Sequence, residues 1–208
     1  MKQNTWNFDE WAGRYDKIIR EDTDIFGRYD EVLDRVVAVS RLSKGKRVLD
    51  IGTGTGNLAL RCLRKEASVI GIDPSEPMLA KARKKIKGKS GIEFQQVDEP
   101  FLVNPYPDNY FDVVVSSYAF HHVPHREKTQ CIDEMVRVLK SGGVWALGDL
   151  CFKDKTQEKL ALKEYDWLDE DEYFIRIDEM KAVFKKLGMR LNSEQFTPVT
   201  WVLWALKP

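Results

Sequence analysis

The chain has 208 residues, of which 33 are basic and 33 acidic, so its formal net charge is zero. This length suits one α/β domain with a sizeable core, and the charge balance argues against a DNA- or RNA-binding surface. No apolar run reaches the roughly 18 residues of a membrane span, and the charged start of the chain lacks a signal-peptide core. Cys62, Cys131 and Cys151 have no metal or redox spacing, which indicates buried thiols in a reducing compartment. We therefore expect a cytoplasmic protein without a membrane partner.

Apolar side chains near helical spacing mark the start of the chain. Within residues 6–20 they are Trp6, Phe8, Trp11, Tyr15, Ile18 and Ile19. The pattern favours an amphipathic helix, and two roles fit it: packing on the body of the protein, or covering a ligand site as a lid. A second helix is expected over about 30–42, with Leu33, Val36 and Val37 facing inward.

A buried strand over 48–51 runs into a glycine-rich turn, and a helical pattern begins at Asn57. Glycine at positions 52, 54 and 56 permits a tight turn and a close approach of the backbone to a ligand. The helix N-terminus behind the turn offers unpaired N–H groups. These features predict a nucleotide-type binding loop. A dinucleotide fingerprint would need its third glycine at position 57, and the Gly-Lys-Ser/Thr of a P-loop is also missing.

The D-I-G-x-G-x-G pattern at 50–56 resembles motif I of the class I S-adenosylmethionine-dependent methyltransferases. The resemblance implies an α/β, Rossmann-like fold: a doubly wound seven-stranded, mostly parallel sheet with an antiparallel C-terminal strand. It also implies S-adenosylmethionine as the cofactor.

An acidic residue lies at or just after the end of each of the next two strands. The strand over 68–73 ends at Asp73, 21 residues after Gly52, where an acid is expected to accept hydrogen bonds from ribose hydroxyls. Ser75 is better placed than Asp73 to cap the following helix, and Met78 on that helix suits either an adenine contact or the core. The strand over 92–97 precedes Asp98. The resemblance implies that this acid, in a register that can slip by one residue, accepts from the adenine amino group.

The fourth strand, over 110–116, leads into the segment S-x-Y-A-F-H-H at 116–122. Ligands of a doubly wound sheet bind beyond the carboxyl ends of the strands, so this segment is expected to face the transferred methyl group. Together with F-D-x-x-A-x-x-Y-D at 8–16, it resembles the small bacterial methyltransferases of the YrrT type over nearly the whole chain. In related enzymes the N-terminal segment lies over the cofactor, which implies a lid that contains Tyr15.

His121 and His122 are the candidate catalytic residues, because a histidine beside the acceptor can take its proton near neutral pH. A structural role is the alternative. A metal site that combines both with His125 is not expected. No carboxylate or cysteine completes a recognisable ligand set, and Pro124 interrupts the helical spacing.

Pro124 suits the first turn of a helix that Gly142-Gly143 ends, and a fifth strand follows over 144–149. Helical segments are expected over 153–165 and 177–187. The resemblance implies that an insertion at this point shapes the acceptor pocket. Candidates to line that pocket, or alternatively to fill a satellite core, are Trp167, Tyr173, Phe174 and Arg176.

Two extended runs, 190–197 and 199–206, predict a closing antiparallel hairpin. We expect one domain over 1–208. Its parts are an N-terminal helical lid (1–44), a cofactor-binding core (45–150), and a helical insertion with the closing hairpin (151–208).

The expected activity is in-line methyl transfer from S-adenosylmethionine to a small-molecule acceptor held in a dry pocket. A non-catalytic S-adenosylmethionine sensor and, less favoured, an NAD-dependent oxidoreductase are the alternatives. No metal and no nucleic acid partner are expected, and the sequence leaves monomer and homodimer open. The expected cofactor-binding residues are Tyr15, Asp50, Gly52, Thr53, Gly54, Gly56, Asn57, Asp73, Pro74, Met78, Asp98, Glu99, Ser116 and Tyr118.

Overall fold

The computed structural model describes residues 8–102, 105–169 and 171–208, and Trp6 therefore lies outside the described residues. One central sheet runs in the order β3-β2-β1-β4-β5-β8-β7. Its strands are β1 (Arg47–Ile51), β2 (Ser68–Asp73), β3 (Ile92–Gln96), β4 (Phe111–Ser117), β5 (Leu139–Phe152), β7 (Asn192–Gln195) and β8 (Thr200–Leu206). A short strand, β6 (Ile175–Arg176), pairs with β5 outside this path.

The strands from β3 to β5 are all parallel to their neighbours, and β8 is antiparallel to both β5 and β7. This confirms the fold class that the sequence predicts, including the antiparallel C-terminal strand. The strand order reverses between β1 and β4, which places a ligand crevice beyond the carboxyl ends of these two strands.

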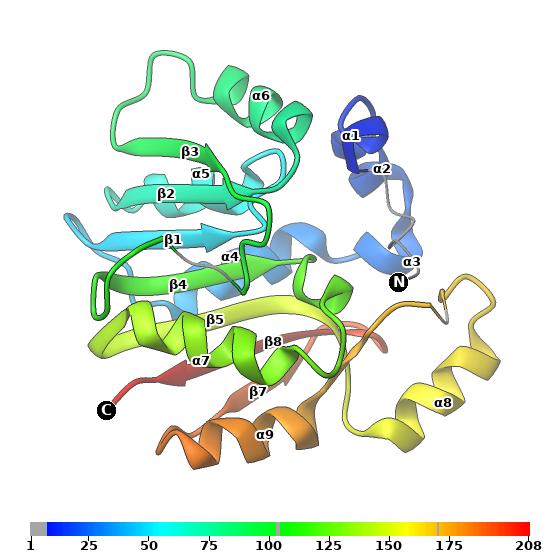
Figure 1. Cartoon of the computed structure of the whole chain (residues 1–208). Coiled ribbons are helices and arrows are strands. Elements are labelled where there is room, and N and C mark those ends of the chain that lie inside the picture. The colour runs from blue at the N-terminus through cyan, green and yellow to red at the C-terminus, as the bar shows by residue number, and fades with distance from the viewer. Residues whose placement is uncertain (1–7, 103–104, 170) are drawn as a thin grey trace.

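Helices cover both faces of the sheet (Figure 1). One buried cluster joins the sheet to α7 (Lys128–Val138) and α9 (Ile177–Lys186), and the other joins it to α4 (Tyr29–Val39), α5 (Asn57–Leu63) and α6 (Glu76–Lys85). The apolar stripe of α4 explains which side of the helix packs on the sheet: Val32, Leu33 and Val36 are fully buried, and its charged residues face outward. A further helix, α8 (Lys155–Glu164), lies in the insertion after β5.

The N-terminal segment is not the single helix that its periodicity predicts. It forms α1 (Phe8–Trp11), α2 (Tyr15–Glu21) and α3 (Thr23–Phe26), which lie near the carboxyl end of the sheet (Figure 1). The turn between α1 and α2 contains Gly13, a poor helix former. Asp22 then caps α3 by accepting from the N–H groups of Asp24 and Ile25.

Two boundaries around α7 also differ from expectation. The helix begins at Lys128, one turn after Pro124, whose carbonyl accepts from the N–H groups of Glu127 and Lys128 in a preceding turn. It ends at Val138, so Gly142 and Gly143 lie inside β5 instead of ending the helix. There the pairing of β4 with β5 shifts register, which marks a bulge. Within the described residues, no helix is long and apolar enough to cross a bilayer.

Gly148 in β5 lies beneath α4, and a Cβ added to it would meet Val32 Cγ1 at 2.7 Å and Val36 Cγ2 at 3.0 Å. Replacing Gly148 with alanine should lower the free energy of unfolding by about 1–3 kcal/mol, because the methyl group overpacks this interface. Gly13→Ala is the matched control, since its added Cβ meets nothing within 4 Å. Urea denaturation measures both, and a G148A protein as stable as the unsubstituted chain would contradict the packing described.

Candidate functional site

A cavity of about 610 Å³ lies at the carboxyl ends of the parallel strands. Its wall is built from the glycine loop after β1, the ends of β2 and β4, the segment after β3, the N-terminal helices, and five residues between α8 and β6: Trp167, Leu168, Asp169, Glu172 and Phe174. Predicted site residues in the wall are Tyr15, Gly52, Thr53, Gly54, Asn57, Asp73, Pro74, Met78, Asp98, Glu99, Tyr118, His121 and His122. The fold therefore brings most of the residues selected from sequence to one place.

The glycine loop requires glycine for reasons visible in its backbone. Gly52 has a φ of +67°, and a Cβ there would lie 2.5 Å from the Cβ of Ala119. Gly56 has a φ of +81° and occupies the N-cap of α5, where a Cβ would approach Phe94 and Ala82. Gly52 therefore lets the chain leave β1 directly beside the segment that follows β4, and Gly56 lets the start of α5 approach β3 and α6.

Asp73, at the end of β2, orders this loop through its carboxylate. Its Oδ2 accepts from the N–H of Gly54 at 2.8 Å, and its Oδ1 accepts from the N–H of Ser75 at 2.9 Å. Burial raises the pKa of Asp73 to about 6, against the opposing effect of these hydrogen bonds. Ser75 caps α6 as expected, accepting from the N–H of Met78. A carboxylate at the end of β2, beside the half-buried backbone of Gly54, suits a ligand with ribose hydroxyls.

Three of the predicted cofactor residues lie behind the wall and do not line the cavity: Asp50, Gly56 and Ser116. Asp50 is fully buried, accepts from the Thr53 hydroxyl at 2.7 Å, and has its pKa raised to about 7 by burial. It supports the loop from below. Ser116 points away because side chains alternate along β4, and Ser117 lines the cavity in its place.

Two acids of the N-terminal segment hold it against the glycine loop and α6. Asp16 Oδ1 accepts from Lys85 Nζ at 2.8 Å and from the Thr55 hydroxyl at 2.7 Å. Lys85 also donates to Asn57 Oδ1 at 2.8 Å. Asp9 Oδ1 accepts from the Ser75 hydroxyl at 2.6 Å. These bonds hold apolar wall residues over the cavity, namely Phe8, Trp11, Tyr15 and Ile18.

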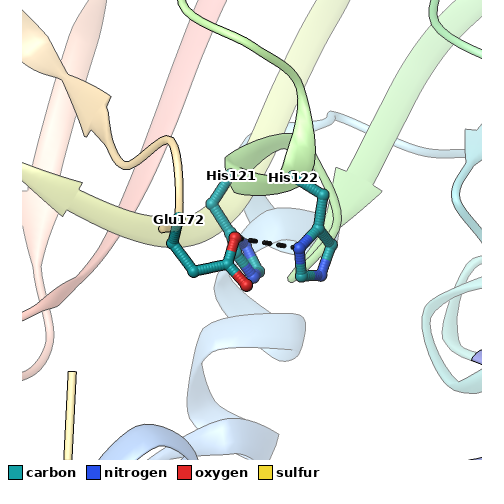
Figure 2. Close-up of side chains that lie close together, drawn as sticks. All are labelled: His121, His122 and Glu172. Atoms are coloured by element: carbon teal, nitrogen blue, oxygen red, sulfur yellow. Dashed lines mark hydrogen bonds and ion pairs between the residues drawn. The ribbon is translucent and has the colours of Figure 1, made fainter. Parts of the chain in front are cut away.

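The two histidines form a short 3₁₀ turn after β4, η1 (Phe120–His122). Tyr118, with a φ of +49°, turns the chain out of the strand toward them. His121 Nδ1 lies 2.5 Å from Asp149 Oδ1, and His122 Nδ1 lies 3.0 Å from Glu172 Oε2. The ring centroids are 3.9 Å apart. Figure 2 shows Glu172 reaching toward both rings from a separate segment of the chain.

The surroundings of the two rings shift their pKa values in opposite directions. Burial opposes protonation of His121, but the charge and hydrogen bond of Asp149 outweigh it and raise the pKa. For His122, burial and the neighbouring His121 lower the pKa against the effect of Glu172. Asp149 is fully buried and also accepts from the N–H groups of Ala119 and Phe120. At a given pH, His121 therefore carries more positive charge than His122.

Sequence reasoning missed both carboxylates. Asp149 ends the predicted fifth strand, at the edge where ligands bind, and this position was a usable signal. The sequence showed no carboxylate that completes a ligand set with the histidines, but the fold brings Glu172 to them. Glu172 lies 50 residues beyond His122 in the chain, and no local spacing pattern links the two. Of the predicted pocket residues, Trp167 and Phe174 line the cavity, whereas Tyr173 and Arg176 do not. Arg176 instead pairs with Glu158.

Comparisons with known proteins agree with this geometry. Residues 48–143 match the methyltransferase domain family. An uncharacterized methyltransferase of Geobacillus sp. (strain WCH70) is 34% identical, with 96% of both chains covered. One of Bacillus cytotoxicus is 35% identical, again with 96% of both chains covered. The chain therefore belongs to this family of bacterial methyltransferases.

Solved structures show the shared fold. A magnesium protoporphyrin IX methyltransferase from Synechocystis, solved with S-adenosylhomocysteine (SAH), has a TM-score of 0.77 at 20% identity and covers 97% of this chain and 96% of its own. The DhpI–SAH complex has a TM-score of 0.74 at 20% identity, and the match covers 97% of this chain and 94% of the DhpI chain. With its family membership, the protein is a class I methyltransferase that uses S-adenosylmethionine, and the NAD-dependent alternative falls away.

Asp149→Asn removes the charge that faces His121 while keeping the shape of the side chain. Because burial of the ring remains, the pKa of His121 should change from above its ordinary value to below it. NMR titration of the histidine ring protons, with a chelator present, measures this change. An unaltered His121 pKa in D149N would contradict the pairing.

The same pair predicts how stability depends on pH. The pKa of His121 is raised in the folded state, so its pairing with Asp149 adds to the free energy of unfolding at pH values below the ordinary histidine pKa. This contribution is lost as the pH rises through the folded-state pKa. Denaturation at several pH values should show this decline in the unsubstituted protein and not in D149N. The same dependence of stability on pH in both proteins would contradict this prediction.

Proposed function

We propose that this methyltransferase transfers a methyl group in line to a small-molecule acceptor. The observation that carries the proposal is a single cavity whose wall contains both the cofactor loop and the histidine pair. Its volume of about 610 Å³ falls in the range of small-molecule sites. A concave site of this size favours a small acceptor over a protein or nucleic acid surface.

Charge in the wall narrows the acceptor class. Among the described residues, none of those that line the cavity is a lysine or arginine. Seven carry carboxyl groups: Asp22, Asp73, Asp98, Glu99, Glu127, Asp169 and Glu172. A phosphorylated or carboxylated acceptor would meet no lysine or arginine side chain here, and the seven carboxyl groups would disfavour it. The wall therefore favours a neutral or cationic acceptor.

For the cofactor, we assign Asp73 to the ribose hydroxyls, Asp98 and Glu99 to the adenine amino group, and Met78 to the ring. S-adenosylmethionine supplies an electrophilic methyl group on a sulfonium that leaves as a neutral thioether. The buried Asp50, Gly56 and Ser116 would support these contacts from behind the wall. The division into a lid (1–44), a core (45–150) and an insertion with hairpin (151–208) is part of the proposal, as is a reducing cytoplasmic location, which suits three buried free thiols.

Catalysis would rest on positioning and exclusion of water. In this proposal the N-terminal helices, which line the cavity, cover the cofactor, and Trp167 and Phe174 add apolar surface from the insertion. Holding two reactants collinear in such a pocket can contribute several kcal/mol, on the order of 7–11 at the limit. His121 and His122 lie where they can act on the acceptor atom, either directly as proton acceptors or through a bound ion.

Calorimetric titration with SAH tests the cofactor site, with NAD as the control ligand. Asp73→Asn should weaken SAH binding by about 10- to 100-fold, because charge-assisted hydrogen bonds to the ribose are lost. Since the pKa of Asp73 is about 6, affinity should fall as the pH drops through 6 in the unsubstituted protein and stay level in D73N. Equal affinities of the two proteins at pH 8 would remove Asp73 from the site.

A screen for SAH formation with amines, thiols and hydroxyl compounds, neutral, cationic and anionic, tests the acceptor class. Turnover should be confined to neutral and cationic acceptors. His121→Ala and His122→Ala should lower kcat by about 10²–10⁴-fold, the usual contribution of such groups, and leave the SAH dissociation constant nearly unchanged. SAH binding without turnover of any acceptor would instead indicate a sensor, and methylation only of a protein or RNA would refute a small-molecule acceptor.

A further inference from the structure

Three side chains gather at the acceptor end of the cavity. His121, His122 and Glu172 each offer one ligand atom, and these atoms all lie within 4.8 Å of one another. They come from two elements, η1 and the segment between α8 and β6, which meet only in the folded chain (Figure 2). All three line the cavity. This grouping is the only one of three or more such residues among those that the structure describes.

The spacing approaches that of a mononuclear metal site. Ligand atoms at about 2.1 Å from a tetrahedral zinc ion lie roughly 3.4 Å apart. His122 Nδ1 and Glu172 Oε2 are already 3.0 Å apart, and an ion between them would displace the proton that they share. Glu172 lies on a loop, so rotation of its side chain can close the remaining distance to His121.

The outer contacts of His121 match those of metal-ligating histidines. Its Nδ1 is held by Asp149, which is fully buried and fixed by two backbone N–H groups of the same turn. A carboxylate on one ring nitrogen sets the tautomer so that the other, Nε2, presents its lone pair. The two carboxylates, Asp149 and Glu172, also supply negative charge to offset a divalent cation in a buried place.

We propose that His121, His122 and Glu172 bind one divalent transition-metal ion of the zinc type. Two imidazoles and one carboxylate form a set used in catalytic zinc sites, which leave at least one position open. That position would face the cavity. Magnesium is disfavoured, because it prefers oxygen ligands.

The role of this ion rests on the methyl transfer proposed above. A hydroxyl or thiol of the acceptor bound at the open position would lose its proton to water, because the ion lowers its pKa. The oxygen or sulfur would then be held as the nucleophile, and the two histidines would act as ligands and not as bases.

Metal binding can be measured without any acceptor. Chelator-treated protein is incubated with Zn²⁺, Co²⁺ or Mg²⁺, desalted, and analysed for metal per chain, and the visible absorption of the Co²⁺ form is recorded. We expect about one zinc or cobalt ion per chain, a cobalt spectrum showing nitrogen and oxygen ligation, and no retained magnesium. Glu172→Gln and His122→Ala should each weaken zinc binding at least tenfold.

Glu127→Gln is the matched control, because Glu127 also lines the cavity but lies outside the cluster. It should bind zinc as the unsubstituted protein does. SAH titration of every sample separates this proposal from the methyltransferase function: intact SAH binding in E172Q shows a folded protein. No retained zinc in a protein that binds SAH would overturn the proposal, and so would equal zinc binding by E172Q and the unsubstituted chain.

Discussion

The site depends on one buried carboxylate. Asp149 lies at the point where β5 passes the carboxyl end of β4, and it accepts hydrogen bonds from the backbone of η1 and from the ring of His121. An unpaired buried charge would be costly, so the turn, the ring and the strand must come together for any of them to be stable there. The two neighbouring parallel strands supply the framework, and the carboxylate converts their shared edge into a defined position for a functional side chain.

The parts of this molecule that sequence could predict are those governed by local rules. The glycine loop, Asp73 and the cap at Ser75 follow from backbone conformation and spacing along one strand–turn–helix unit. The closing hairpin follows from two extended runs, 190–197 and 199–206, whereas the doubly wound, mostly parallel sheet is expected from the resemblance to class I methyltransferases. The acceptor end could not be predicted in this way. His122 and Glu172 meet across the whole of α7, β5 and α8, and only the tertiary fold determines that contact.

The predicted ends of helices and strands were wrong where contacts with other parts of the fold override local sequence preference. Gly142 and Gly143 resemble a helix terminator, yet they lie within β5, in the bulge where its pairing with β4 shifts from Leu139 to Val144. Their backbone groups exchange hydrogen bonds with Lys207. The N-terminal stripe has helical spacing, but its two acids are committed to Ser75 and Lys85 on other elements. The turn that contains Gly13 separates the helix that carries Asp9 from the helix that carries Asp16.

The attachment of Asp16 to Lys85 has a consequence for the rate of the enzyme. On the proposed lid role, cofactor and spent product pass beneath the same helices, so this ion pair and its hydrogen bonds to Thr55 and Asn57 break and re-form in every cycle. Opening of a cover on this scale often limits kcat in place of chemistry. The half-exposed pair is also open to counterions. Ionic strength would then affect kcat, because higher salt would weaken the ion pair and shorten the residence time of the product.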